Sequence, residues 1–426
     1  MKRADKGAGT GGLAALLTIA YRNIWRNRRR TVLCGTAVAI AVFFNVFMQS
    51  WIEGMIGGIE EVVRTYETGH VHVTSALFEA EKEYYPVQYP VADGRDAGDL
   101  VAEIESIPGV KAALPRITAY ATLFDSTVKH ALLWGIDPVR EREVNLFNLT
   151  ERSDGMVRGR YPDAGANECA VGFDLARRTG LGLGDKLPLK TVSAQFSDKY
   201  WNPTIVGIFR FDYRRYDEDV ILVPLDRLSR VLVLGGGAQQ IFVYAEDPGR
   251  VSGIRAAVAA AAGPGNVVRE WTDNYWVAIL RQSTFLYLVI FGVFQVVASF
   301  LIINTVLMVI HERIKEIGMM GALGMTRREI VSVFFLEAVC LSVLGAAAGC
   351  LVGGLASWIG SLFPIDLNTF TGGGMKDMPI SGTIFLKFSP GILARGFGFG
   401  VLVSAACTLV PSLRSAFIEP VEALRR

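Results

Sequence analysis

The chain has 426 residues, of which 51% are hydrophobic and 20% charged, and its formal net charge is +2. The mean hydropathy of +0.34 excludes an ordinary soluble domain and indicates an integral membrane protein. No nucleic-acid partner is expected.

The first 31 residues are predicted to form a cytoplasmic N-terminal segment. Residues 13–30, LAALLTIAYRNIWRNRRR, combine spaced apolar side chains with a basic cluster. This pattern is similar to that of an amphipathic helix lying at the inner-leaflet interface. A plain basic cluster that only sets membrane topology is compatible with the same residues.

Four membrane-spanning helices are predicted at residues 32–52, 284–310, 330–363 and 392–410. The first contains 20 consecutive residues without a charge, enough to cross a hydrocarbon layer of about 30 Å. Lys and Arg number eight in residues 1–31, four in 311–329 and three in 411–426, against two in 364–391. The positive-inside rule therefore places both termini and the 311–329 connector in the cytoplasm, and the 364–391 loop outside it.

Residues 53–283 are too long for a loop and are predicted to form an extracytoplasmic α+β domain between the first and second spans. Strands are expected at residues 69–73, 119–124, 131–135, 204–209, 220–223 and 241–244, and helices at 97–106, 173–179 and 251–262. At its two ends, residues 54–66 and 267–282 keep helical spacing. They are expected to be stalk helices that continue the spans outward.

The connector at 311–329, HERIKEIGMMGALGMTRRE, is a short charged segment between two long apolar runs. Helical spacing puts Ile314, Ile317, Gly321 and Leu323 on one face, with charged side chains around the rest. The pattern indicates a small amphipathic helix that contacts a cytoplasmic partner. The alternative is an ordinary loop whose basic residues only set topology.

No catalytic, cofactor-binding or metal site is predicted. Gly7, Gly9 and Gly12 fit the spacing of a dinucleotide-binding loop, but no strand precedes them, and residues 181–186 lack the spacing of a phosphate loop. His70 and His72 would share one side of a strand without an apparent third ligand. Cys169 is the only cysteine of the external domain, so no disulfide can form within it.

The third span carries two further signals. Gly345, Gly349 and Gly353 recur every four residues, which lines one helix face with residues small enough for another helix to approach closely. Glu337 is a carboxylate inside a span, where charge is costly and often functional. The structural interpretation of Glu337 is a hydrogen bond to a neighbouring helix, with Asn304 or Gln295 as the partner.

Taken together, these motifs resemble the FtsX-like permease family of ABC transporters. The sequence at 20–24, AYRNI, followed by basic residues, is similar to the start of the family pattern, and PVEALR at 420–425 is similar to its end. The connector resembles the family's coupling helix, with Glu337 and the glycines of the third span following it. The residues carried over to ATPase coupling are Glu312, Arg313, Glu316, Ile317, Gly318, Gly321, Ala322, Leu323, Gly324, Met325, Arg327 and Arg328.

The resemblance implies a multi-pass permease of the bacterial inner membrane without enzymatic activity of its own. Its implied partners are a cytosolic ABC ATPase dimer, which binds ATP and Mg, a second permease chain that is identical or homologous, and membrane lipid. The turns at 134–138 and 180–185 and the lack of a fused ATPase are similar to lipoprotein-releasing subunits, which makes a periplasmic lipoprotein carrier a candidate partner. The 364–391 loop departs from that pattern.

The favoured hypothesis is thus a permease that turns ATP hydrolysis by a separate ATPase into periplasmic motion, for lipoprotein release or export of an amphiphile. The alternative is an ATP-driven regulator of a cell-wall hydrolase or sensor that transports nothing. A membrane-anchored external enzyme is disfavoured because no catalytic cluster is apparent.

Overall fold

The structure is a computed structural model that describes residues 28–91, 95–124, 130–144, 158–211, 214–312, 314–315, 319, 322–323, 325–363, 365–366 and 383–415. The chain divides into two compact units. One comprises residues 1–55, 282–365 and 385–426, and the other comprises residues 56–281 and 366–384. The predicted amphipathic segment at 13–30 lies almost entirely outside the described residues.

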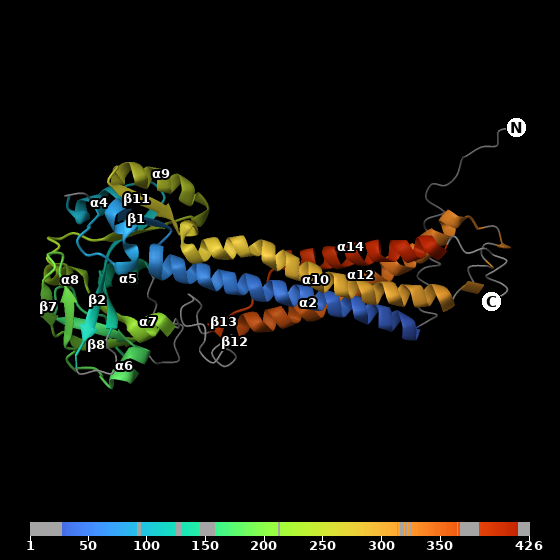
Figure 1. Cartoon of the computed structure of the whole chain (residues 1–426), viewed down its shortest axis with the longest axis horizontal. Coiled ribbons are helices and arrows are strands. Elements are labelled where there is room, and N and C mark those ends of the chain that lie inside the picture. Colours follow the sequence, from blue (N-terminus) through green and yellow to red (C-terminus); the bar gives the residue numbers. More distant parts are fainter. Residues whose placement is uncertain are drawn as a thin grey trace. The chain divides into compact units, whose positions relative to one another are not determined.

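Four long helices dominate the first unit and its borders, α2 (Arg28–Val62), α10 (Tyr275–Glu312), α12 (Arg327–Leu362) and α14 (Pro390–Ser415) (Figure 1). Among the residues described, three stretches are long and apolar enough to cross a membrane, Thr31–Thr68, Arg327–Leu362 and Pro390–Leu409. The span predicted at 284–310 falls within α10, and its place in the membrane stays a prediction. Between α12 and α14, the structure describes the short strands β12 (Ile365–Asp366) and β13 (Thr383–Ile384).

The second unit is built on a mixed sheet of eleven strands, with the order β11-β1-β10-β2-β3-β9-β5-β8-β4 and with β6 and β7 attached through β2. The strands are β1 (Val71–Ser75), β2 (Val110–Leu123), β3 (His130–Ile136), β4 (Arg158–Gly159), β5 (Glu168–Gly172), β6 (Leu189–Val192), β7 (Asp198–Trp201), β8 (Thr204–Phe209), β9 (Val220–Pro224), β10 (Gln240–Ala245) and β11 (Asn266–Glu270). The pairs β3–β9 and β5–β8 are parallel, and the other pairs are antiparallel. This is the α+β architecture expected from the sequence.

The 14-residue strand β2 joins the two halves of the sheet. Its first part, up to Arg116, pairs with β10, and its second part, from Ile117, pairs with β3. Residues Ala121 to Leu123 pair in addition with β6. A single uninterrupted strand therefore belongs to both halves of the domain.

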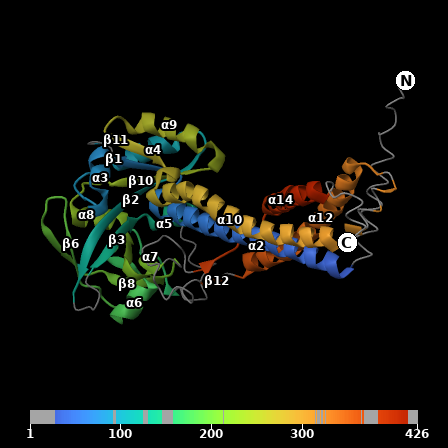
Figure 2. The same ribbon diagram turned by 45° about the vertical axis from the view of Figure 1, so that its right-hand side comes forward.

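Short helices cover the sheet. They are α3 (Ala76–Ala80), α4 (Ala97–Glu105), α5 (Pro138–Val144), α6 (Phe173–Thr179), α7 (Arg214–Asp219), α8 (Leu225–Leu232) and α9 (Val251–Ala262), with single turns η1 (Val63–Thr68), η2 (Lys82–Tyr84), η3 (Pro248–Arg250) and η4 (Trp271–Asp273). Figures 1 and 2 show α4 and α9 side by side over the half that contains β1 and β11.

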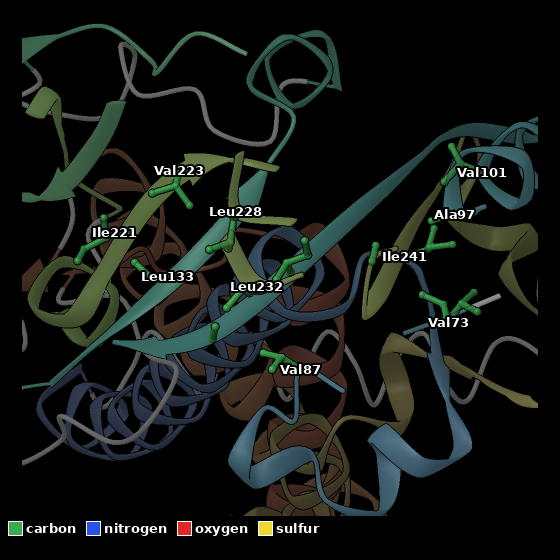
Figure 3. Packing of buried hydrophobic residues seen from close by; sticks show 14 of the residues in the cluster. Val73, Val87, Ala97, Val101, Leu133, Ile221, Val223, Leu228, Leu232 and Ile241 are labelled. Carbon is green, nitrogen blue, oxygen red and sulfur yellow. The ribbon is translucent and has the colours of Figure 1, made fainter. Parts of the chain in front are cut away.

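The core is apolar and continuous beneath these helices. Figure 3 shows Leu228 and Leu232 of α8 close to Leu133 of β3, and Ala97 and Val101 of α4 close to the strands β1 and β10. Burying a Leu, Ile or Val side chain contributes about 1.5–3 kcal/mol relative to leaving it exposed. The apolar positions of the predicted helix at 97–106 and of the predicted strand at 220–223 thus contribute to this core.

A buried ion pair joins strand β2 to helix α5 in the external domain. Arg116 of β2 donates from Nη2 to Glu141 Oε1 of α5 at 2.5 Å, and each side chain is 1% exposed. The guanidinium also lies over the Phe242 ring, 4.4 Å from its centroid. No sequence pattern predicted this ion pair, because its two residues are separated by 25 positions and come from different elements.

The predicted second stalk needs a correction. Residues expected to be helical from 267 onward instead form β11, which pairs with β1 over Val71–Ser75, followed by the turn η4. The helix begins only at Tyr275. Val267 and Val268 are β-branched residues that favour a pleated strand when a partner edge is present, and this outweighs their helical spacing. At the first stalk, α2 does continue to Val62, and η1 extends it to Thr68.

Candidate functional site

The connector at 311–329 is described at Glu312, Ile314, Lys315, Met319, Ala322, Leu323 and Met325 onward. Six predicted coupling residues lie outside the described residues, Arg313, Glu316, Ile317, Gly318, Gly321 and Gly324. Of the others, Ala322, Arg327 and Arg328 are exposed, Met325 is half-buried, and Leu323 is 87% exposed. Glu312 is the last residue of α10, and its side chain lies outside the described part of the chain. A large apolar side chain among exposed basic residues is a chemically suitable contact for a protein partner.

The end of the connector is fixed by a capping box at the start of α12. The Thr326 hydroxyl accepts a hydrogen bond from the Glu329 backbone N–H at 3.4 Å, and the Glu329 carboxylate accepts from the Thr326 N–H at 2.8 Å. These bonds satisfy backbone donors that a helix start otherwise leaves unpaired. The helix that carries Arg327 and Arg328 is therefore held at its first turn.

The glycine face of α12 lies against α2. A methyl group added at Gly345 would approach the Gly35 carbonyl oxygen to 2.7 Å, and one added at Gly349 would approach the Ala39 carbonyl oxygen to 2.5 Å. One added at Gly353 would meet Val46 Cβ at 3.1 Å. At Gly345 and Gly349 the two backbones therefore approach too closely to leave room for a side chain on α12, and at Gly353 the space is tight.

A second set of small residues lies on α14 and was not selected in the sequence. Methyl groups added at Gly396 and Gly400 would clash with Val46 and Val42, respectively. The valines at positions 38, 42 and 46 of α2 are buried, and they recur every four residues like the glycines that face them. The motif GFGFG at 396–400, with this same spacing, was the signal that could have identified α14 as the other wall.

Glu337 of α12 is buried, with 7% of its surface exposed. Of the two partners considered from the sequence, Asn304 is exposed, and the side chain of Gln295 lies outside the described residues. Glu337 lies about two helical turns before the first glycine of this face, Gly345, and its role stays a prediction.

The external domain contains a cavity of about 400 Å³ at the place where the chain enters and leaves the domain. We call it the junction pocket. Its walls come from η1, η2 and η4, the helices α3 and α7, and the strands β1, β2, β3, β10 and β11. Aromatic, charged and other polar side chains line it, among them Tyr66, Glu67, His72, Glu79, Lys82, Tyr85, Arg116, Trp134, Tyr216, Gln240, Arg269 and Asn274.

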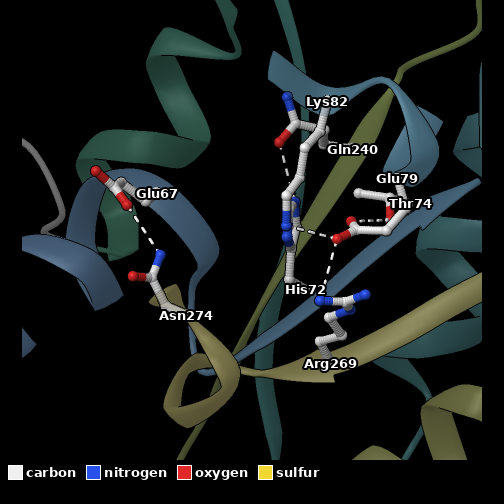
Figure 4. A network of polar contacts seen from close by, with 8 residues as sticks. All are labelled: Glu67, His72, Thr74, Glu79, Lys82, Gln240, Arg269 and Asn274. Atoms are coloured by element: carbon white, nitrogen blue, oxygen red, sulfur yellow. Dashed lines mark hydrogen bonds and ion pairs between the residues drawn. The ribbon is translucent and has the colours of Figure 1, made fainter. Parts of the chain in front are cut away.

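Glu67 joins the two chain segments at this pocket. Its Oε1 accepts a hydrogen bond from the Tyr216 hydroxyl at 2.7 Å, and its Oε2 accepts from the Asn274 side-chain amide at 3.0 Å. Figure 4 shows Glu67 facing Asn274 across the gap between η1 and the segment after η4. One carboxylate thus ties the incoming segment, the outgoing segment and α7 together.

A second network lies around Glu79 (Figure 4). Its carboxylate pairs with Lys82 at 2.7 Å and with Arg269 at 3.1 Å. Beside it, His72 Nε2 lies 3.0 Å from Gln240 Oε1, so the imidazole donates through that nitrogen. Burial lowers the pKa of His72 to about 4, and burial followed by the charges of Arg64 and Lys111 lowers that of His70 to about 4.

The two histidines considered as metal ligands are engaged in other bonds. His70 Nδ1 accepts from the Ala245 backbone N–H at 3.1 Å, and His72 is bonded to Gln240. Among the described residues, no group of three or more His, Cys, Asp or Glu side chains has the arrangement of a metal site. Cys169 is buried, and burial raises the pKa of its thiol, which makes it unreactive. The hydrogen bonds and ion pairs around the junction pocket are suited to holding chain segments together.

Comparison with known families matches both parts of the chain. The MacB-like periplasmic core domain matches residues 31–261, and the C-terminal domain of FtsX-like permeases matches residues 288–420. The first match alone spans more than half of the 426 residues.

Individual relatives agree with the family matches. The chain is 23% identical over 348 residues to the lipoprotein-releasing system transmembrane protein LolC of Neisseria meningitidis, covering 78% of this chain and 81% of that protein. It is 29% identical over 435 residues to the pyoverdine export ATP-binding/permease protein PvdT of Pseudomonas fluorescens, covering 98% of this chain and 60% of that protein. Among solved structures, the periplasmic region of MacB from Actinobacillus actinomycetemcomitans is 9% identical with a TM-score of 0.35, covering 52% of this chain and 95% of that one.

Proposed function

We propose that this chain couples a separate ATPase to motion outside the membrane. The premise is that it belongs to the FtsX-like permeases of ABC transporters and carries a MacB-like periplasmic core domain. The observation that carries the proposal is that both family matches fall on the expected parts of the chain, on either side of the junction between external domain and α10. The chain itself is then a permease subunit, and ATP and Mg belong to the partner.

The connector at 311–329 is the proposed contact with that ATPase. Support comes from exposed Leu323 beside Arg327 and Arg328 and from the capping box that holds α12 at its first turn. Closure of the ATPase would move the connector, and α12 would pass the motion to α2 through the glycine face. This requires four spans, with both termini and the connector in the cytoplasm.

The permease is proposed to work as a pair, with a second copy of itself or a homologous chain. A single connector offers one contact surface, whereas an ATPase dimer with two-fold symmetry presents two equivalent ones. A symmetric or nearly symmetric pair of permeases would occupy both.

The proposed cargo is an amphiphile of the outer leaflet of the inner membrane. LolC, to which the chain is 23% identical, is named for lipoprotein release. Release of a lipoprotein to a periplasmic carrier, or export of another amphiphile, is the function that this relationship supports best.

Co-purification tests the coupling. The full chain carrying Glu316→Ala, Gly324→Leu or Arg327→Ala is expressed with its candidate ATPase, and the ATPase bound per permease is measured. We expect at least a tenfold loss of bound ATPase, because each substitution changes the proposed contact. Arg177→Ala, an exposed cation of the external domain, is the matched control and should retain full binding.

Labelling of a cysteine introduced at residue 320 tests the topology independently. A membrane-impermeant maleimide should label it only after the inner membrane is opened. Labelling in intact spheroplasts would place the connector outside and remove the basis for ATPase contact.

A further inference from the structure

The segment before α14 ties together the ends of two helices. The backbone N–H of Lys387 donates to the Ser50 carbonyl of α2 at 3.0 Å, and that of Leu386 donates to the Gly360 carbonyl of α12 at 3.0 Å. The Leu386 side chain is buried, and a methyl group added at Gly360 would meet its Cδ1 at 2.9 Å. We call residues 385–389 the strap.

Three charged side chains meet beside the strap. Glu53 of α2 forms ion pairs with Lys387, at 3.5 Å, and with Arg395 of α14. The carboxylate is 32% exposed, whereas Lys387 and Arg395 are 57% and 59% exposed. Within the described part of the chain, these two cations therefore share one carboxylate and keep most of their surface available to another anion.

The position of this cluster along the helices is informative. Glu53 is the first charged residue after the uncharged run of α2, and α14 has no charged residue between Arg395 and Arg414. Relative to the predicted spans at 32–52 and 392–410, all three charges lie at or near an end, where lipid headgroups are expected. The neighbouring Phe385 and Phe388 are 47% and 43% exposed, as is common for aromatic side chains at a membrane interface.

The charge at this end is opposite to what topology alone would favour. On the proposed topology, the cluster lies on the outer side, where Lys and Arg are under-represented because they are not needed to set orientation. Helix association in the chain is already provided by the glycine faces. Two cations for one carboxylate exceed what an ion pair between α2 and α14 requires.

We propose that Lys387 and Arg395 bind the phosphate group of an anionic phospholipid at the outer surface of the membrane, with Phe385 and Phe388 against its glycerol and upper acyl region. Glu53 offsets part of the charge of the two cations and competes with the phosphate for them. The site rests on the membrane topology proposed above, but it does not need the ATPase, cargo release or a second permease.

The test uses the full chain, purified without ATPase in a neutral detergent, and a headgroup-labelled phosphatidylglycerol whose binding is followed by fluorescence anisotropy. Lys387→Gln and Arg395→Gln should each weaken binding about fivefold, the effect typical of one cation at an anionic surface. Arg395→Lys, which keeps the charge, should retain most of the affinity. Arg250→Gln removes an 83% exposed cation from the external domain and should change nothing.

Glu53→Gln is the decisive variant, because the two interpretations predict different changes in lipid affinity. If the cluster serves the lipid, this variant frees both cations and binding becomes tighter, even though it removes two ion pairs. If the cluster only fastens α2 to α14, the variant does not bind more tightly, and the proposal is overturned. Equal binding by wild type and both cation variants would overturn it as well.

A competition arm separates the two sources of phosphate. Inorganic phosphate at millimolar concentration should displace little of the labelled lipid, because it lacks the apolar part that meets the phenylalanines. Complete displacement at matched ionic strength would identify a site for free phosphate and contradict the lipid assignment. Neither result bears on ATPase binding, so failure here leaves the coupling proposal standing.

Discussion

The helices of the membrane unit and the sheet of the external domain are held together by different kinds of contact. Between α2, α12 and α14, glycines bring backbones together, and three valines fill the remaining space. In the external domain, large apolar side chains form the core, and a buried ion pair and polar networks fix particular segments. In lipid, apolar side chains gain little by leaving their surroundings, so close packing replaces the hydrophobic effect as the main source of specificity.

Breaking the buried ion pair should give the largest loss of stability. It would remove a kind of contact that distinguishes the external domain from the membrane helices. Glu141→Ala leaves Arg116 charged and without its carboxylate in the interior, which typically costs about 3–5 kcal/mol. Hydrogen exchange of β2 and β10 in the detergent-solubilised full chain measures the loss. Replacing both residues, Arg116→Met with Glu141→Leu, should recover much of it. A double variant as unstable as the single one would mean that the charges themselves are needed.

Acid should weaken the external domain through its histidines. The pKa of His72 is about 4 in the folded state, below the ordinary value of 6.5, so the folded state binds fewer protons than the unfolded state between these values. Stability is therefore full above pH 6.5 and falls as the pH drops toward 4, by about 3 kcal/mol at most. Thermal unfolding at several pH values should show a smaller acid loss for His72→Gln. His130→Gln, at an exposed position, is the control and should follow wild type.

A single methyl group tests the packing of the membrane helices. Gly349→Ala forces a carbon against the Ala39 carbonyl and should destabilise the full chain by about 1–3 kcal/mol, as overpacking does. Gly398→Ala is the matched control because nothing lies within 4 Å of its added carbon. Alanine favours helix over glycine, so the control should be neutral or slightly stabilising in thermal unfolding. Equal effects of both substitutions would show that close backbone approach is unimportant at Gly349.

The smallest expected effect concerns the start of α12. Thr326→Ala removes the cap hydroxyl and should cost about 1 kcal/mol. Faster hydrogen exchange confined to the first turn of α12 is the expected readout, while Thr326→Ser should retain protection. Loss of protection throughout the helix would indicate that the cap holds more than this turn.

Much of the external fold could be predicted from the sequence because its elements carry local periodicity. The expected ranges 204–209, 173–179 and 251–262 coincide with β8, α6 and α9. Strand β11 was missed because helical spacing and strand propensity coexist at 267–270, and pairing with β1 decides between them. Local patterns cannot report a partner strand almost 200 residues away in the chain.

The candidate sites also divide into features that a local sequence pattern predicts and features that only the fold reveals. Glycines every four residues indicate a close contact of α12 from one segment alone, whereas the partner face on α2 is visible only in the fold. The junction pocket combines Glu67, Arg116, Tyr216 and Asn274 from four separate segments, and none of these residues belongs to a recognisable motif. Tertiary structure, which brings such segments together, was the missing information.

The length of β2 has a mechanical consequence. Because its hydrogen bonds continue from β10 to β3 without an interruption of the strand, a force applied at one edge of the sheet is carried along a covalent backbone to the other half. The two halves of the sheet are therefore expected to move together as one rigid body when force is applied. Deleting a single residue near Ile117 would reverse which side chains face the core beyond that point. The same deletion would uncouple the two halves of the sheet.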